Sequence, residues 1–274
     1  MHPYLFSFGP LEVHAYGFLM AAGFAAGLLH WILLGRHRGY DRATCTDLMI
    51  WVMVSGIIGA RVAYVLENLS MFMAYPAEII RLDQGGLVFY GGLAASAGAV
   101  LVFSKRRKLA LLPLVDFTLT AVPLSHAFGR IGCFLNSCCY GVVCGSGGCG
   151  VSFPRFSLPW HRQVQAGLLD AQAMRSLPVY PVQLYEAGFN LVVYVLLLLV
   201  YRKQQRAGFV AAGYLVLYAL GRFVLEFFRG DHADRFGVGG FSVGQIVSVP
   251  LLGTGIALIV LLWRKQQKAE GGAR

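Results

Sequence analysis

The stretch HAYGFLMAAGFAAGLLHWILL, residues 14–34, is apolar and as long as a helix that crosses a bilayer. Such a helix needs about 20 consecutive, mostly apolar residues. Similar stretches follow along the chain at 45–66, 86–103, 109–128, 182–200, 208–227 and 242–263. The sequence therefore predicts an all-α polytopic membrane protein with seven transmembrane helices.

The composition supports a membrane protein. Of the 274 residues, 57% are hydrophobic and 13% are charged, and the mean hydropathy is +0.62. An ordinary soluble domain carries more charge and less apolar area. We expect one transmembrane domain over 1–274, whose first apolar stretch remains as a helix because basic residues follow it rather than precede it.

The formal net charge of +10 comes from basic residues that gather in every second loop. These are Arg36, Arg38 and Arg42; Lys105, Arg106, Arg107 and Lys108; Arg202, Lys203 and Arg206; and Arg264, Lys265 and Lys268. Loops rich in Lys and Arg stay in the cytoplasm. This alternation predicts an outer N-terminus and a cytoplasmic C-terminus, and it argues against nucleic acid as a partner.

The segment 129–181, between the fourth and fifth spans, is too polar and too rich in Gly and Pro to cross the membrane. We expect an irregular segment on the outer side. It begins with GRIGCFLN (129–136), which is apolar enough to lie at the interface or dip into the membrane. Irregular backbone at that depth must be covered by protein or line a wet cavity.

Five cysteines crowd this segment, whereas Cys45 stands alone in the second span. The five are Cys133, Cys138, Cys139, Cys144 and Cys149. On an oxidising side of the membrane, one or two structural disulfides are the favoured interpretation. Zinc is less favoured, because the spacings are not of the C-x2-C kind and the nearby His126 and His161 lack the usual short separation. We therefore predict no metal.

Two arginines, Arg130 and Arg222, lie inside or at the rim of apolar spans. A guanidinium at membrane depth costs about 2.5–3.5 kcal/mol, so it marks a functional site by default. Helical spacing places Arg222, Glu226 and Arg229 on one face near the outer end of the sixth span. This ladder could neutralise itself. Alternatively its surplus positive charge, with that of Arg130, could bind a phosphate at the rim of a lipid-filled pocket.

Other polar positions allow two interpretations each. Tyr16 is either an interfacial belt aromatic or part of a site, and Arg61 by itself favours snorkelling to the interface. Two glycine pairs, 85–86 and 91–92, flank a short apolar strip at the outer mouth of the third span. They could bring backbone close to an anionic ligand or permit tight helix packing.

Seven blocks carry a resemblance to a known family. They are VHAYGFLM (13–20), GARVAYV (59–65), GGLVFYGGL (85–93), GRIGCFLN with CCYG (129–141), YPVQLYEA (180–187), GRFVLEFFRGD (221–231) and SVGQIVS (242–248). In this order they resemble the bacterial prolipoprotein diacylglyceryl transferases. The resemblance implies transfer of the diacylglyceryl group of phosphatidylglycerol to the thiol of a prolipoprotein's lipobox cysteine. A thioether forms and glycerol phosphate is released, as the first step of lipoprotein maturation.

The resemblance also implies residue roles. Arg130, Arg222 and Tyr90 would be catalytic. The two arginines would hold the lipid phosphate, Glu226 would orient Arg222, and Tyr90 stands where the family usually has a histidine suggested as the base. The implied substrate-binding residues are Arg130, Tyr16, Arg61, Gly91, Gly92, Asn136, Gly141, Gln183, Tyr185, Glu226 and Arg229. The implied partners are phosphatidylglycerol, prolipoprotein signal peptides and membrane lipids, with no cofactor. The implied location is the bacterial cytoplasmic (inner) membrane, with the active site toward the outer leaflet.

The sequence departs from the family pattern at Cys133, where asparagine is common, and at Cys138, where an acidic residue is frequent. The cysteines could rigidify the segment after Arg130 or mark a divergent branch with another lipid or thiol acceptor. A transporter is a rival class, but no internal repeat is evident. A membrane thiol–disulfide enzyme is another, but no C-x-x-C pair occurs.

Overall fold

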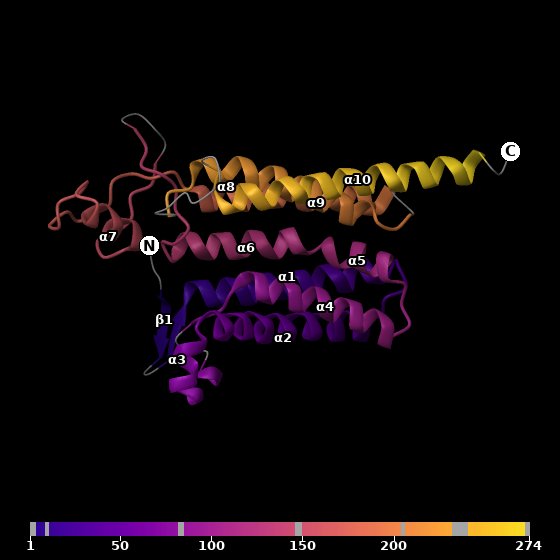
Figure 1. The fold of residues 1–274 in the computed structure, drawn as a ribbon, viewed down its shortest axis with the longest axis horizontal. Helices are drawn as coiled ribbons and strands as arrows, with labels where there is room; N and C mark the ends of the chain where they lie inside the picture. The colour runs from indigo at the N-terminus through magenta and orange to yellow at the C-terminus, as the bar shows by residue number, and fades with distance from the viewer. Residues whose placement is uncertain are drawn as a thin grey trace. The chain divides into compact units, whose positions relative to one another are not determined.

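The computed structural model describes residues 4–8, 11–81, 85–145, 150–203, 206–231 and 241–271. It is mostly helical (Figure 1). Within these described ranges, six helical stretches are long and apolar enough to cross a membrane: Ala15–Gly35, Arg42–Glu67, Leu111–Leu135, Val182–Lys203, Phe209–Phe228 and Val243–Lys265. The prediction of a polytopic helical membrane protein is therefore confirmed.

The remaining predicted span, 86–103, forms helix α4, Phe89–Arg106. It is not among the six stretches that meet both criteria. Its 18 residues begin with an aromatic pair and two glycines and end with Lys105 and Arg106. These residues lower the mean hydropathy of the helix. The count of seven spans, and their orientation, stay predictions.

The chain divides into two compact units. The middle unit is Leu28–Phe117, and the terminal unit combines Met1–Gly27 with Thr118–Arg274. Helix α1, Ala15–Gly35, runs through the boundary. The other helices of the middle unit are α2 (Arg42–Glu67), α3 (Leu69–Ala74), the 3-10 helix η1 (Pro76–Ile80), α4 and the greater part of α5 (Leu111–Leu119).

Within the middle unit, α2 packs directly against α4. Glycines permit this approach: a Cβ on Gly59 of α2 would overlap Ala95, and a Cβ on Gly91 of α4 would lie 2.5 Å from the Gly59 carbonyl oxygen. Small residues at such contacts are typical of helix pairs in membranes. At the other end of the pair, Arg107 forms an ion pair with Asp47.

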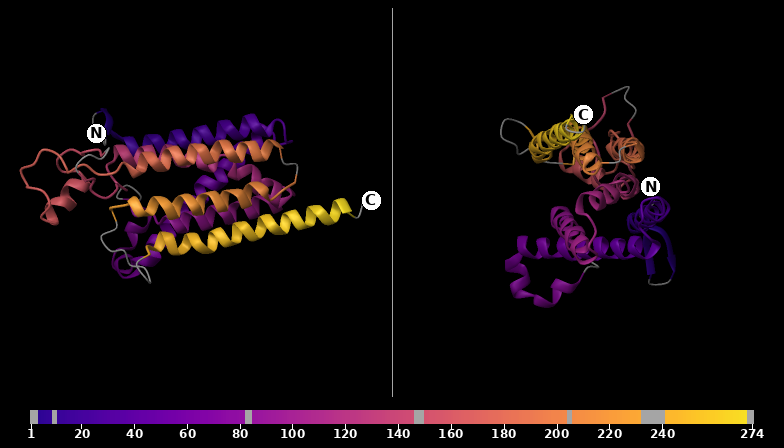
Figure 2. Two further views of the ribbon diagram at one scale, coloured as in Figure 1. Left: turned by 90° about the horizontal axis from the view of Figure 1, so that it is seen from above. Right: turned by 90° about the vertical axis from the view of Figure 1, so that its right-hand side faces the viewer.

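The terminal unit begins with an antiparallel hairpin of β1 (Tyr4–Phe8) and β2 (Leu11–His14). This two-stranded sheet is a departure from the all-α prediction; its segments are rich in aromatic and branched residues, which favour strands. The helices that follow α5 are α6 (Val122–Leu135), α7 (Leu158–Gln165), α8 (Val182–Lys203), α9 (Phe209–Leu225) with the 3-10 helix η2 (Glu226–Phe228), and α10 (Val243–Gly271). Helix α8 packs between α6 and α9, and α10 lies along α9 (Figures 1 and 2).

The irregular segment between the fourth and fifth predicted spans starts later than predicted. Helix α6 continues through GRIGCFL and ends at Leu135, and the Asn136 N–H donates to the Gly132 carbonyl at the C-cap. The apolar residues 129–135 extend the preceding helix, so irregular backbone begins at Asn136. That 129–136 lies at the interface or dips into the membrane stays a prediction. Beyond Asn136 the segment has a small core of its own, formed by Tyr140, Phe153 and Val179.

Candidate active site

Three arginines converge on one carboxylate in the terminal unit. Arg130 of α6 forms an ion pair with Glu186 of α8 through its Nε. The guanidinium of Arg222, from the last turn of α9, lies 3.5 Å from Glu186 Oε1. Arg229, which follows η2, lies 3.6 Å from the same oxygen. The predicted convergence of Arg130 and Arg222 is therefore present, and Glu186 is its centre.

The predicted ladder on α9 is also present. Arg222 binds Glu226 at 2.9 Å, and Arg229 lies 3.8 Å from the same carboxylate. Helix α10 leaves room for this contact at Gly244, where a Cβ would lie 3.1 Å from both Arg222 Nε and Glu226 Oε1. Because Glu226 is buried, it can hold Arg222 in a fixed orientation.

A third carboxylate completes the network. Asp231 accepts two hydrogen bonds from Arg229, at 3.0 and 2.7 Å. Burial lowers the pKa of Arg229, but the charges of Asp231 and Glu186 outweigh burial and hold this pKa above its ordinary value. The three arginines thus face three carboxylates, Glu186, Glu226 and Asp231, which offsets the surplus of positive charge that the ladder alone indicated.

The arginines differ in access. The side chains of Arg130 and Arg222 remain 16% and 20% exposed, whereas that of Arg229 is only 7% exposed. An incoming anion can therefore reach Arg130 and Arg222 more readily than Arg229. Arg130 also donates a hydrogen bond of 3.3 Å to His126 one turn earlier on α6, which fixes the side chain from a second direction.

Glu186 is the residue that the sequence reasoning missed. It lies within the block YPVQLYEA, in which the family resemblance implied roles only for Gln183 and Tyr185. The available signal was an acidic residue in the second turn of an apolar helix, because a buried carboxylate there requires a cationic partner. Glu186 is only 4% exposed.

Four more predicted residues belong to the terminal unit. Tyr16 of α1 packs against Gly132 of α6, whose Cβ would lie 3.2 Å from the tyrosine ring. Gln183 is fully buried on α8, and its amide donates to the Cys138 carbonyl at 2.7 Å. Tyr185 lies beside Glu186 in sequence and is 38% exposed. Asn136 caps α6, and its amide approaches Cys138 Sγ at 3.8 Å.

Gly141 positions Arg229 through the backbone. It forms an antiparallel bridge with Arg229, and its N–H donates to the Tyr180 carbonyl at 3.0 Å. A Cβ at this position would lie 2.6 Å from the Tyr180 oxygen and 2.7 Å from the Phe228 oxygen. Only glycine fits between the backbone at Tyr180 and the backbone at Phe228 without moving either segment.

The cysteine cluster differs from the favoured interpretation. The Sγ atoms of Cys133, Cys138 and Cys139 lie within 4.8 Å of one another, and all three are free thiols, so the structure shows no disulfide among them. Hydrogen bonds from the other two thiols, together with the charges of Arg130 and Arg229, hold the pKa of Cys139 below its usual range although burial opposes this. Cys144 is buried, and Cys149 lies outside the described residues.

The other predicted residues belong to the middle unit. Arg61 of α2 donates to the carbonyls of Glu78, Ile79, Gly85 and Gly86 at 2.5 to 3.1 Å. This arginine therefore binds the connection between α2 and α4 rather than simply snorkelling. Tyr90, in the first turn of α4, is 59% exposed, and Gly91 and Gly92 lie against the backbone of α2.

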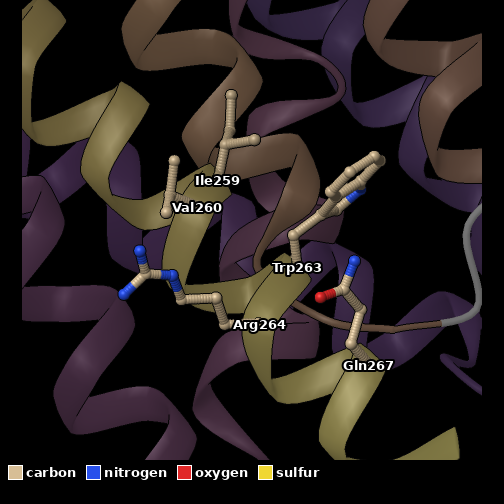
Figure 3. Close-up of a pocket in the computed structure, with 5 residues that line it drawn as sticks. All are labelled: Ile259, Val260, Trp263, Arg264 and Gln267. Atoms are coloured by element: carbon tan, nitrogen blue, oxygen red, sulfur yellow. The ribbon is translucent and has the colours of Figure 1, made fainter.

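A cavity of about 250 Å³ lies elsewhere, at the C-terminal part of α10 (Figure 3). Its lining residues are Ile259, Val260, Trp263, Arg264 and Gln267, all from that one helix. None of the arginines of the network lines it. This cavity is therefore separate from the candidate site.

Known proteins of one family match this sequence over nearly its whole length. The family described as prolipoprotein diacylglyceryl transferase matches residues 3–261. A phosphatidylglycerol–prolipoprotein diacylglyceryl transferase 2 of Clostridium perfringens is 31% identical over 95% of each chain. The transferase of Xanthomonas campestris is 34% identical over 94% of this chain and 90% of its own. That of Pseudoalteromonas atlantica is 34% identical over 98% and 92%. The chain that carries this arginine–glutamate network belongs to the prolipoprotein diacylglyceryl transferase family.

Proposed function

We propose that this protein transfers the diacylglyceryl group of phosphatidylglycerol to the thiol of a prolipoprotein's lipobox cysteine. The observation that carries the proposal is the meeting of Arg130 and Arg222 at Glu186, within helices that can span a membrane. The relatives named above act on these two substrates, according to their names. The site therefore needs a group that binds a lipid phosphate, and the two accessible guanidiniums supply it.

In the proposed reaction the substrate thiolate attacks the glyceryl carbon that bears the phosphate oxygen. The carbon–oxygen bond breaks, and its electron pair leaves with glycerol phosphate. Arg130 and Arg222 stabilise the charge that develops on this leaving group, because a planar guanidinium binds phosphate through two N–H groups and stays charged. Loss of one such donor typically lowers the rate on the order of 100- to 1000-fold.

The remaining predicted residues take supporting roles in this proposal. Glu186, Glu226 and Arg229 hold the two phosphate-binding arginines in place. Tyr16, Asn136, Gly141, Gln183 and Tyr185 line or support the lipid site in the terminal unit. From the middle unit, Arg61, Gly91 and Gly92 contribute to substrate binding, and the Tyr90 hydroxyl hydrogen-bonds the headgroup or assists proton removal.

We further propose that the whole chain forms one catalytic domain with seven membrane crossings, α4 included. Its basic loops face the cytoplasm, as the positive-inside rule predicts. The N-terminus and the segment after α6 then lie on the outer side of the bacterial inner membrane. This orientation places the arginine network toward the outer leaflet, where exported prolipoproteins arrive.

The test is a transfer assay with purified protein in nanodiscs, phosphatidylglycerol and a lipobox peptide. Mass spectrometry should detect the peptide with a diacylglyceryl thioether, and a peptide with Ser in place of the lipobox Cys should stay unmodified. Arg130→Ala and Arg222→Ala should each lose on the order of 100-fold or more in rate. Arg107→Ala, at the end of α4, is the matched control and should retain the wild-type rate.

Two results would contradict the proposal. One is active, folded protein that forms no thioether with this lipid. The other is full activity in both arginine variants. Tyr90→Phe separates the hydroxyl from the ring, because a hydroxyl role predicts a slower reaction whereas ring packing predicts no change.

A further inference from the structure

His126 of α6 borders the arginine network, and the proposed function gives it no part in the reaction. It lies one turn before Arg130 on the same helix, and its Nε2 accepts a hydrogen bond of 3.3 Å from Arg130 Nε. The ring is half-buried, and the charge of Arg222 also acts on it. An imidazole, which is the side chain most often used as a general base, therefore lies beside both phosphate-binding arginines.

The contacts of the ring define which nitrogen can accept a proton. Because Nε2 accepts from Arg130, it carries the lone pair, and Nδ1 carries the hydrogen. Asn190 of α8 also hydrogen-bonds the ring. The amide nitrogen of Asn190 donates to the Glu186 carbonyl at 2.8 Å, so its oxygen remains to accept the Nδ1 hydrogen. These contacts favour a neutral imidazole whose basic nitrogen faces Arg130.

The lone pair of Nε2 is only weakly engaged. Arg130 Nε has a single hydrogen, and the same nitrogen forms the ion pair with Glu186. The carboxylate lies closer to this nitrogen than the imidazole does, so the hydrogen points mainly to Glu186. A contact of 3.3 Å is also long for a hydrogen bond. Nε2 can therefore exchange this contact for the proton of another group.

The place of His126 along α6 matches that of the reacting carbon. In the orientation proposed above, α6 runs outward, so His126 lies about 6 Å closer to the bilayer centre than Arg130, four residues earlier on the helix. A phospholipid whose phosphate binds the arginines points its acyl chains inward. Its glyceryl carbon then lies on the inner side of the phosphate, which is also the side of the imidazole. A thiol that attacks this carbon is brought toward Nε2.

The surrounding charges set when the imidazole takes up a proton. The charged and titratable groups that border the ring are Arg130 on its own helix, Glu186 of α8, and Arg222 and Tyr218 of α9. An imidazolium beside two guanidiniums is opposed by their positive charge. The phosphate of bound phosphatidylglycerol offsets this charge. Proton transfer to His126 is therefore favoured once the lipid is bound.

We propose that His126 is the base that removes the proton of the lipobox thiol. This inference rests on the proposed function and names the catalytic residue that activates its nucleophile. The proton passes from sulfur to Nε2, and the sulfur forms a bond to the glyceryl carbon. The carbon–oxygen bond breaks, and its electron pair leaves with glycerol phosphate. The imidazolium then releases its proton to water, which restores the base.

The first test is the transfer assay with His126→Gln. The glutamine amide can still accept from Arg130, so the phosphate site stays intact, but it cannot take up a proton. At neutral pH kcat should fall about 100-fold or more, the scale of general-base assistance, and the KM for phosphatidylglycerol should stay level. His161→Gln is the matched control, because His161 is an exposed histidine of α7, and it should retain the wild-type rate. Full activity of His126→Gln would overturn the inference.

The pH dependence separates a base from a positioning residue. A cysteine thiol ionises unaided at about pH 8.5, so the rate of His126→Gln should rise about tenfold per pH unit between about pH 6.5 and 8.5. The wild-type rate should change much less over this range, and the gap between the two proteins should narrow. An equal deficit at every pH would show that His126 only positions Arg130, which contradicts the proposal.

A lipobox peptide with selenocysteine in place of cysteine gives an independent test. A selenol is already ionised at neutral pH, so its transfer needs no base. His126→Gln should modify this peptide at the wild-type rate, which also shows that the variant is folded, whereas Arg222→Ala should stay slow. A His126→Gln protein that remains slow with the selenol peptide would refute the assignment.

These outcomes differ from a failure of the proposed function. A wild-type protein that forms neither thioether nor selenoether would refute the function itself. Transfer by the wild-type protein that does not depend on His126 would refute only the base.

Discussion

Glu186 is the residue on which the arginine network depends. Removing one member of a buried ion pair typically destabilises a protein by about 3–5 kcal/mol, because the partners remain buried without compensation. Here the partners are Arg130, Arg222 and Arg229. Glu186 does not itself bind the lipid in the proposed reaction, so it is a positioning residue.

For Glu186→Gln we expect a fall in kcat on the order of 100-fold, because small displacements of reacting groups carry such costs. The KM for phosphatidylglycerol should stay level or decrease, since the lost negative charge no longer competes with phosphate. Steady-state kinetics in nanodiscs measure both constants. Glu67→Gln at the end of α2 is the control, and an increased KM with unchanged kcat would show that Glu186 binds substrate directly.

Gly244 provides a second residue-scale prediction. A methyl group there would lie 3.1 Å from Arg222 and Glu226, whereas Gly253 on the same helix has open space around its Cβ position. We expect Gly244→Ala to lower kcat/KM about 10-fold through displacement of Arg222. Gly253→Ala should leave activity unchanged, and equal rates in both variants would contradict the prediction.

Among the elements, the connection between α2 and α4 depends on Arg61. Its guanidinium binds four backbone carbonyls. A hydrogen bond from a charged group contributes about 1.5–3 kcal/mol, and less where water reaches it. Arg61→Met should therefore lower the melting temperature in detergent and expose the 69–81 segment to protease. Arg81→Met is the control. A raised KM with unchanged melting temperature would instead favour the substrate-binding role that the family resemblance implies for Arg61.

The elements also show which features a sequence reveals. Apolar runs predicted the spanning helices because run length is a local property. The ladder of Arg222, Glu226 and Arg229 was predictable for the same reason, since helical spacing alone aligns it. The end of α6 was misplaced because the change to irregular structure depends on tertiary contacts beyond Asn136. The encounter of Glu186 with Arg130 was not predictable, because it joins two helices that are distant in sequence.

At the scale of the whole molecule, the alternation of basic loops predicts orientation. A green fluorescent protein inserted after Arg38 or fused after the last residue should fluoresce in the cytoplasm. Alkaline phosphatase inserted after Gln172, an exposed position in the outer segment, should be active outside it. The opposite pattern at any of these positions would contradict the proposed topology and the outward placement of the arginine network.

The equality of three guanidiniums and three carboxylates has a consequence for turnover. A purely cationic cradle would hold the doubly charged glycerol phosphate long after the thioether had formed. In this protein Glu186 and Glu226 compete with the product phosphate for the arginines. Their ion pairs re-form when the product moves away, and this speeds product release. We therefore expect weak product inhibition by glycerol phosphate, because the ion pairs of the free enzyme re-form after each turnover.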